Sequence, residues 1–179
     1  PYLSRGLGDV YKRQAAISLT AAEKGRLAQG EVVQRQSQGS DGGTGIAVQY
    51  VFATPDAVWD TLLDYDRYPD RVKNVVSCDV YKKSGSDWYV DMQNAVFGFK
   101  FGLYTVNHIH RDQGYMTWEL DYSRTSDVGD MVGYWLVEEV RADPPITLLQ
   151  YSTEMKLSGV PDVLVRYLTR ESLVDGTAW

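Results

Sequence analysis

Two histidines have the spacing that most directly suggests metal chemistry. His108 and His110 are two positions apart in a strand-like segment, so their side chains share one face of the strand. Zinc usually takes three or four protein ligands, and the chain offers no other histidine and one thiol, Cys78. The pair is therefore incomplete as a metal site, and we expect neither a metal nor any other cofactor.

Five aspartates form the densest group of acids. They are Asp56, Asp60, Asp64, Asp66 and Asp70. The first three recur every four residues, which places them on one face of a helix. Two carboxylates act as acid and base only when their environments separate their pKa values, and a solvated helix face provides no such difference. We therefore expect a solvent-exposed surface here and not a catalytic pair.

No nucleophile motif accompanies these acids. The chain contains no Gly-x-Ser-x-Gly sequence, no phosphate loop and no dinucleotide fingerprint. Glu138 and Glu139 are adjacent in a strand-like segment, so one of them could point inward as an acid or base. A strand end with both carboxylates in water is the other interpretation. We assign no catalytic residue.

The elements that must position these residues begin with the stretch 53–70. Thr54 is a favourable N-cap and Pro55 a favourable first helical residue, because the N–H that proline lacks would be unpaired there. Tyr68 precedes Pro69 and is thereby biased away from helix, so the chain turns there. A second short helix is expected around residues 70–74.

Strands dominate the rest of the chain. Residues 18–29 are typical of a short polar helix, and 31–38 and 46–52 are typical of strands. Six more strands, separated by short turns, are expected to form an antiparallel meander. Their ranges are 75–83, 87–96, 101–111, 115–124, 132–141 and 146–158. A final helix begins at Pro161, so the pattern indicates an α+β domain whose curved sheet buries one face against that helix.

The first residues are treated separately, because residues 4–14 back-translate into a transposon adapter used for sequencing libraries. We expect residues 1–14 to be a non-native leader, native sequence to begin near Ala15, and the native chain to continue beyond Trp179. The single thiol rules out an intramolecular disulfide and does not fix the cellular compartment.

The charge balance limits the partners. Removing the three basic and one acidic residues of the leader from the 18 basic and 24 acidic residues leaves 15 against 23, a net charge of −8. This charge argues against nucleic acid and anionic membrane surfaces as partners. No apolar run approaches the length of a bilayer span, so we expect no integral membrane segment.

The stretch 53–70, with Thr-Pro, Val-Trp, Asp-Tyr and Tyr-Pro in that order, resembles the START-like, or SRPBCC, superfamily. Within this birch-pollen-allergen-like group, the chain is similar to polyketide cyclases/dehydrases and coenzyme-Q-binding START proteins. The resemblance covers residues 31–179, and residues 15–30 would form a short helical segment ahead of the domain. It implies a helix-grip fold: a curved antiparallel sheet of about seven strands around a long C-terminal helix, with two short helices after the first strand.

The same resemblance implies an apolar cavity between sheet and helix. Aromatic and large apolar side chains are expected to line the cavity or its rim, although ordinary core packing explains any single ring. These side chains belong to Trp59, Tyr65, Tyr68, Met92, Phe97, Phe99, Phe101, Tyr104, Trp118, Leu120, Tyr122, Trp135, Tyr151, Met155, Leu164, Tyr167 and Leu168.

The functions of such proteins range from lipid or quinone carriage to polyketide cyclisation. We expect binding and sequestration or transport of a hydrophobic small molecule or lipid, by a monomer or weak homo-oligomer. The alternative is a polyketide cyclase/aromatase or dehydratase that uses a polar group inside the cavity, with Glu138, Tyr122 and Tyr151 as candidates. A third interpretation is a partner-binding domain whose interior is filled.

Overall fold

The computed structural model describes residues 17–39, 41–157, 159–170 and 173–174. The leader expected at residues 1–14 lies outside the described residues, as does the end of the chain after residue 174.

An antiparallel sheet of eight strands forms the body of the domain, against about seven expected. Two strands precede the helical segment in the chain, as the patterns at 31–38 and 46–52 predicted, whereas the family resemblance implied one. The strands are β1 (Val33–Gln38), β2 (Gly42–Val51), β3 (Val75–Ser84), β4 (Asp87–Val96), β5 (Phe99–His110), β6 (Tyr115–Leu120), β7 (Asp130–Ala142) and β8 (Pro145–Lys156). Their spatial order is β1-β2-β8-β7-β6-β5-β4-β3, so β1 and β3 are the edges.

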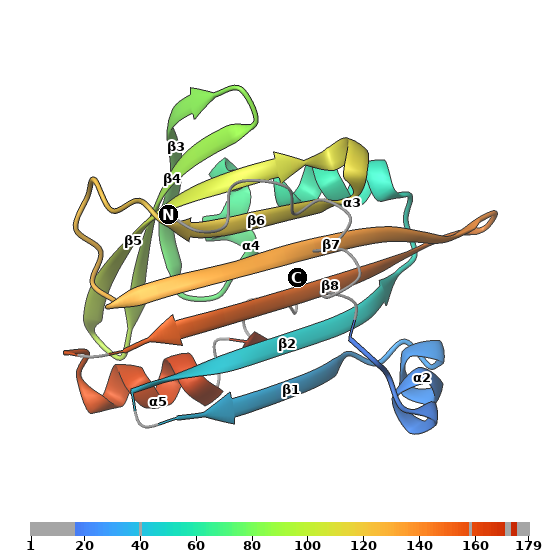
Figure 1. The fold of residues 1–179 in the computed structure, drawn as a ribbon, viewed down its shortest axis with the longest axis horizontal. Helices are drawn as coiled ribbons and strands as arrows, with labels where there is room; N and C mark the ends of the chain where they lie inside the picture. Colours follow the sequence, from blue (N-terminus) through green and yellow to red (C-terminus); the bar gives the residue numbers. More distant parts are fainter. Residues whose placement is uncertain (1–16, 40, 158, 171–172, 175–179) are drawn as a thin grey trace.

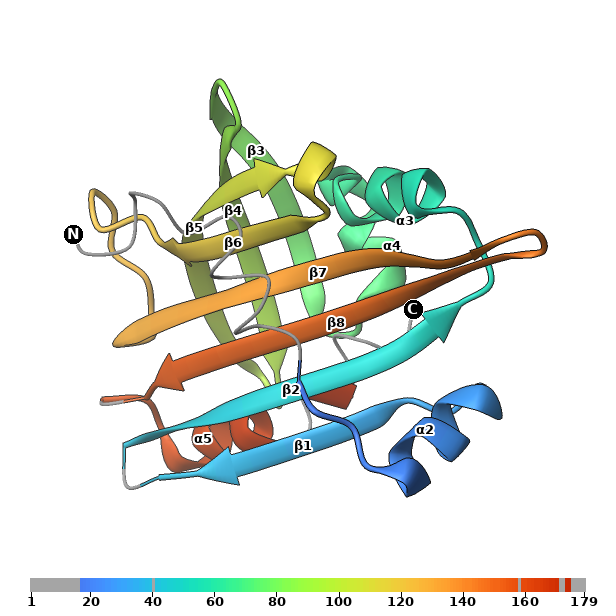
Figure 2. The same cartoon turned by 45° about the vertical axis from the view of Figure 1, so that its right-hand side comes forward.

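The sheet curves strongly along its width. In Figure 2, β3, β4 and β5 cross behind β7 and β8 at a steep angle, which gives the sheet a concave face. Bulges in β3, between Val75 and Ser77 and between Val80 and Lys82, contribute to the bend, because an extra residue on one strand increases its local twist. The short helices between β2 and β3, the terminal helix and the main core lie on the concave face (Figure 1).

The helix after β2 begins where the sequence predicted. In α3 (Pro55–Leu62), the Thr54 hydroxyl accepts a hydrogen bond from the Ala57 backbone N–H at 3.3 Å. The apolar face of α3, which includes Trp59, is buried in the main core. A short 3-10 helix, η1 (Tyr65–Arg67), and α4 (Tyr68–Arg71) follow.

Two details of this corner and of the strands differ from expectation. Helix α4 starts at Tyr68 and not near residue 70, because Pro69 falls in its first turn, where the missing N–H has no partner to lose. Strand β6 ends at Leu120 and not near residue 124, because the Asp121 carboxylate accepts hydrogen bonds from the backbone N–H and hydroxyl of Ser123, which turn the chain.

The terminal helix is short. Helix α5 (Asp162–Arg170) has 9 residues, about 13 Å at 1.5 Å per residue, and the structure shows no long C-terminal helix within the described residues. It packs on β1 and β2 and contributes Leu164, Tyr167 and Leu168 to the core. An additional helix, α2 (Ala21–Ala28), lies beside β1 and β2, where Leu27 packs with Val33 and Val48.

Candidate functional site

A cavity of about 180 Å³ lies between the concave face of the sheet and the short helices. This is well over ten times the space of about 10–15 Å³ that one water needs. Strands β3 to β8, the η1–α4 corner and α5 all contribute to its wall. The lining residues are Tyr65, Tyr68, Val72, Lys73, Val75, Val90, Met92, Asn94, Phe101, Leu103, Thr105, Asn107, Met116, Trp118, Met131, Trp135, Tyr151, Met155, Tyr167 and Leu168.

Strand alternation decides which side chains reach the cavity. On β4 the residues Val90, Met92 and Asn94 line it, and on the paired strand β5 every second residue from Phe101 to Asn107 does so. Successive side chains of a strand point to opposite faces, so the intervening residues face the outside of the sheet.

A cluster of three rings forms one wall. The Trp118 and Tyr151 rings stack at 5.3 Å between centroids, and the Trp135 ring lies 4.7 Å from Tyr151. Gly133 is the partner of Trp118 in the β6–β7 register, and a Cβ there would collide with the Trp118 indole. The missing side chain of Gly133 therefore makes room for this aromatic wall.

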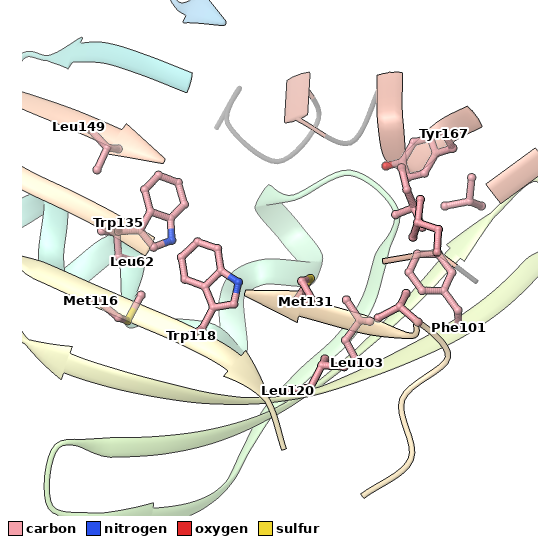
Figure 3. Close-up of a cluster of buried hydrophobic side chains, with 14 of the residues drawn as sticks. Leu62, Phe101, Leu103, Met116, Trp118, Leu120, Met131, Trp135, Leu149 and Tyr167 are labelled. Atoms are coloured by element: carbon pink, nitrogen blue, oxygen red, sulfur yellow. The ribbon is translucent and has the colours of Figure 1, made fainter. Parts of the chain in front are cut away.

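A second group of side chains lies away from the two tryptophans. Figure 3 shows Phe101 and Tyr167 on one side, Trp118 and Trp135 on the other, and Met131 between them. The Asn74 side-chain amide donates a hydrogen bond to the Tyr167 hydroxyl at 2.9 Å. This bond ties the segment before β3 to α5.

Two tyrosines from the η1–α4 corner close another side. Their rings are 5.2 Å apart, the Tyr68 hydroxyl donates to the Leu62 carbonyl oxygen at 2.7 Å, and the Tyr65 hydroxyl lies 3.7 Å from the Met116 sulfur. Burial raises the pKa of both Tyr65 and Tyr68 above the ordinary value, because the ionised phenolate would be desolvated. Both phenols are therefore neutral near pH 7.

Few polar groups face the cavity, and most of these are already paired. The Asn107 amide donates to the Thr105 hydroxyl at 3.0 Å and to the Trp88 carbonyl oxygen at 3.3 Å. The buried Asn94 Nδ2 has no hydrogen-bond partner among the described residues. Within that part of the chain, no carboxylate and no imidazole lines the cavity. The titratable side chains of this described wall are thus Lys73 and the tyrosines, without the carboxylates and imidazoles that most often act as acid and base.

The structure brings ten of the seventeen side chains expected at the cavity into its wall. These ten are Tyr65, Tyr68, Met92, Phe101, Trp118, Trp135, Tyr151, Met155, Tyr167 and Leu168. Three others, Trp59, Leu120 and Leu164, are buried in the adjoining core and do not line the cavity.

The remaining four lie at the surface or on the outer face. Tyr104 alternates with the inward residues of β5 and packs on Tyr81 outside the sheet. Tyr122 is 67% exposed, and its hydroxyl donates to Asp130 at 2.6 Å. Phe97 and Phe99, at the β4–β5 turn, are 66% and 44% exposed, and the Phe97 ring meets the Tyr167 ring edge-on.

The other candidate chemical groups lie apart from the cavity. His108 Nδ1 is 2.8 Å from an Asp87 carboxylate oxygen, and the His110 ring stacks on Tyr115. No cluster of three or more potential metal ligands occurs in the described ranges. Glu138 is exposed on β7.

The helix-face aspartates have structural contacts. Asp56 and Asp60 both pair with Arg111 at 2.9 Å, which ties α3 to the segment after β5. They lie outside the cavity wall, as does Cys78, which is buried and whose pKa burial raises to about 12.

Ten lining residues were missed by the sequence reasoning. They are Val72, Lys73, Val75, Val90, Asn94, Leu103, Thr105, Asn107, Met116 and Met131. Strand alternation would have found several of them, because Asn94 shares a face with Met92, and Leu103 and Thr105 share one with Phe101.

A comparison with models of protein families identifies the family to which this fold belongs. The model of the family described as polyketide cyclase / dehydrase and lipid transport matches residues 51–166, well over half of the chain. The chain belongs to this family. The match runs from the end of β2 into α5 and so includes every residue in the cavity wall except Tyr167 and Leu168.

Solved structures share the family fold at low sequence identity. A STAR-related lipid transfer protein from Xanthomonas axonopodis is 15% identical, with a TM-score of 0.62 over 80% of this chain and 86% of that one. A START superfamily protein from Mycobacterium smegmatis is 15% identical, with a TM-score of 0.59 over 83% and 93%. The Zhui aromatase/cyclase from a Streptomyces species is 16% identical, with a TM-score of 0.57 over 74% and 73%. These likenesses show the START fold alone.

A search of curated proteins with this sequence found no match. In the described part of the chain, no helix is both long and apolar enough to cross a bilayer.

Proposed function

We propose that this protein binds a hydrophobic small molecule or lipid in the cavity and sequesters or transports it without changing it. The observation that carries the proposal is an apolar, ring-lined cavity of about 180 Å³ with no carboxylate or imidazole among its described lining residues. Ligand sites of this kind are mostly apolar, with a few polar groups that fix orientation. The family supports the same assignment, because its description includes lipid transport.

The size of the cavity limits the part of the ligand that fits inside. An apolar cavity of about 150 Å³ accommodates one benzene ring. The 180 Å³ here suits a single ring with a short chain, or the end of a longer lipid. Burying about 250 Å² of apolar ligand surface stabilises the complex by roughly 6 kcal/mol, before the cost of ordering the ligand. The η1–α4 corner with Tyr65 and Tyr68 acts as part of the gate.

Ligand capture and displacement test this function. Native mass spectrometry of the purified protein, followed by extraction, should show a bound apolar molecule, and a fluorescent fatty-acid probe should bind and be displaced by it. Leu103→Trp places an indole in the cavity and should abolish probe binding. Tyr122→Trp adds the same ring at an exposed site and should leave binding unchanged. Absence of both a ligand and probe binding would overturn the proposal.

A cyclase or dehydratase activity is the second candidate, and Tyr151 favours it. Tyr151 lines the cavity, and burial raises its pKa to about 12, so its phenol stays neutral and could donate a hydrogen bond to a substrate carbonyl. The family description and the aromatase/cyclase among the similar structures are consistent with this chemistry. Turnover of a short poly-β-ketone by the wild type, lost in Tyr151→Phe, would support the enzyme. Binding of that compound without turnover would support the carrier.

A further inference from the structure

The side chain of Asn94 is placed where an apolar residue would be expected. It follows Val90 and Met92 on the inward face of β4, and its register partners are Val75 on β3 and Phe101 on β5. Its Nδ2 is inaccessible to water and meets no hydrogen-bond acceptor among the described residues. A buried donor without a partner destabilises a fold, so the contacts within the described protein leave this amide unfavourable.

The other hydrogen-bonding side chains around the cavity do not share this deficit. Asn107 donates to Thr105, Tyr68 donates to the Leu62 carbonyl, and Asn74 donates to Tyr167. A leucine at position 94 has nearly the same shape as asparagine and would remove the unpaired donor. The fold alone therefore gives no reason for an amide at this position, whereas a ligand that brings an acceptor does.

The surroundings of Asn94 indicate which acceptor fits. Lys73, in the segment between α4 and β3 just before Val75, also lines the cavity and is the cationic residue of its described wall. No acid in the described part of the wall opposes an anion there. Phe101, the register partner of Asn94, lies away from the Trp118 and Trp135 indoles (Figure 3). An elongated ligand can thus place its oxygen near Asn94 and its apolar body toward the indoles.

We infer that Asn94, once its side-chain amide rotates so that Nδ2 faces the cavity, is the anchor for a carbonyl or carboxylate oxygen of the ligand, with Lys73 favouring the carboxylate. The cargo is then an apolar acid or ketone and not a hydrocarbon. This inference rests on the proposed binding function and narrows its ligand class.

Three ligands that each carry a four-carbon chain on a phenyl ring separate the contribution of the hydrogen bond from that of the ligand's charge. They are 4-phenylbutanoate, 4-phenylbutan-2-one and butylbenzene, each measured by displacement of the fluorescent probe. Wild type should bind the ketone about fivefold more tightly than the hydrocarbon, as expected for one neutral hydrogen bond, and the acid about tenfold or more. Asn94→Leu should lose most of this preference, still bind butylbenzene, and melt at a higher temperature. Asn94→Asp places a carboxylate at the anchor and should reject the acid selectively.

The control is Gln93→Leu. Gln93 is the neighbouring amide on β4, and it packs against Gly102 on the outer face of the sheet. This variant should keep the wild-type order of ligands. Equal binding of all three ligands by the wild type, or an unchanged order in Asn94→Leu, would overturn the anchor and leave the carrier function standing. Binding of none of them, together with no probe binding, would overturn both.

Discussion

Replacing Gly133 with alanine is expected to destabilise the domain and deform one wall of the cavity. Gly133 pairs with Trp118 across β6–β7, and a Cβ at position 133 would overlap both the Trp118 indole and the Ser152 carbonyl oxygen. The indole has little freedom to move away, because it stacks on Tyr151. The carbonyl belongs to the neighbouring strand β8, so relief requires a shift of the β7–β8 backbone.

The size of the effect follows from these two overlaps. Forcing extra carbon into a packed interior costs about 1–3 kcal/mol, and overlap with backbone favours the upper end of that range. Alanine gains about 0.5–1 kcal/mol over glycine in a strand, because less chain entropy is lost on folding. The net loss is then about 2 kcal/mol, or roughly 4–8 °C in Tm for a domain of this size.

Urea unfolding of Gly133→Ala measures this loss. The matched control is Gly25→Ala, in helix α2, where a Cβ would meet no atom within 4 Å. That change should stabilise the protein by up to about 1 kcal/mol, because glycine is a poor helix former. Trp118→Leu should cost less in the Gly133→Ala background than in the wild type, because the indole overlap is then already removed. Gly133→Ala with wild-type stability, within about 0.5 kcal/mol, would refute the reasoning.

Two further predictions concern pH and helix capping. Tyrosine titrates near pH 10 in the unfolded chain, whereas burial raises the pKa of Tyr151 in the folded protein to about 12. The contribution of Tyr151 to the free energy of unfolding should therefore be fully present below pH 10 and fall by on the order of 2 kcal/mol toward pH 12. Tyr151→Phe should remove this part of the loss in urea titrations and leave the part that the buried Tyr65 and Tyr68 phenols contribute, and an equally steep loss would contradict the assignment. Thr54→Ala removes the acceptor for the Ala57 N–H and should lower stability by about 1 kcal/mol. Thr54→Ser keeps a hydroxyl acceptor and should retain most of the wild-type stability. Equal losses of stability in both variants would exclude capping as the cause.

Local sequence patterns were sufficient to predict most of the elements. Turn residues and alternation placed β4 at 87–96, and the Thr54-Pro55 pair marked the start of α3. The end of β6 was missed, because the Asp121–Ser123 turn is a side-chain effect within a segment that still alternates. The described part of the terminal helix is shorter than expected, because the expected length came from the family resemblance and not from a stop signal in the chain.

The cavity was harder to predict than the fold. Tyr104 was placed inside because its aromatic ring decided the assignment, although alternation along β5 puts Tyr104 and Phe101 on opposite faces. Phe99 and Phe101 share a face of β5, yet only Phe101 lines the cavity, because Phe99 lies where the strand begins at an exposed turn. Asn94 was missed because a polar residue on a strand is normally assigned to the solvent side.

The pairing of β2 with β8 sets the order in which the domain can be assembled. The strands from β3 to β8 follow one another in both sequence and space, so each can join its neighbour as soon as it emerges from the ribosome. The β1–β2 hairpin is synthesised first, but its partner β8 begins only at Pro145, and the register then joins Gly42 to Lys156. Such long-range closure is slow in folding. Until synthesis passes β8, one edge of β2 therefore stays open to chaperones or to other chains, and α5, which completes the wall of the cavity, is made later still.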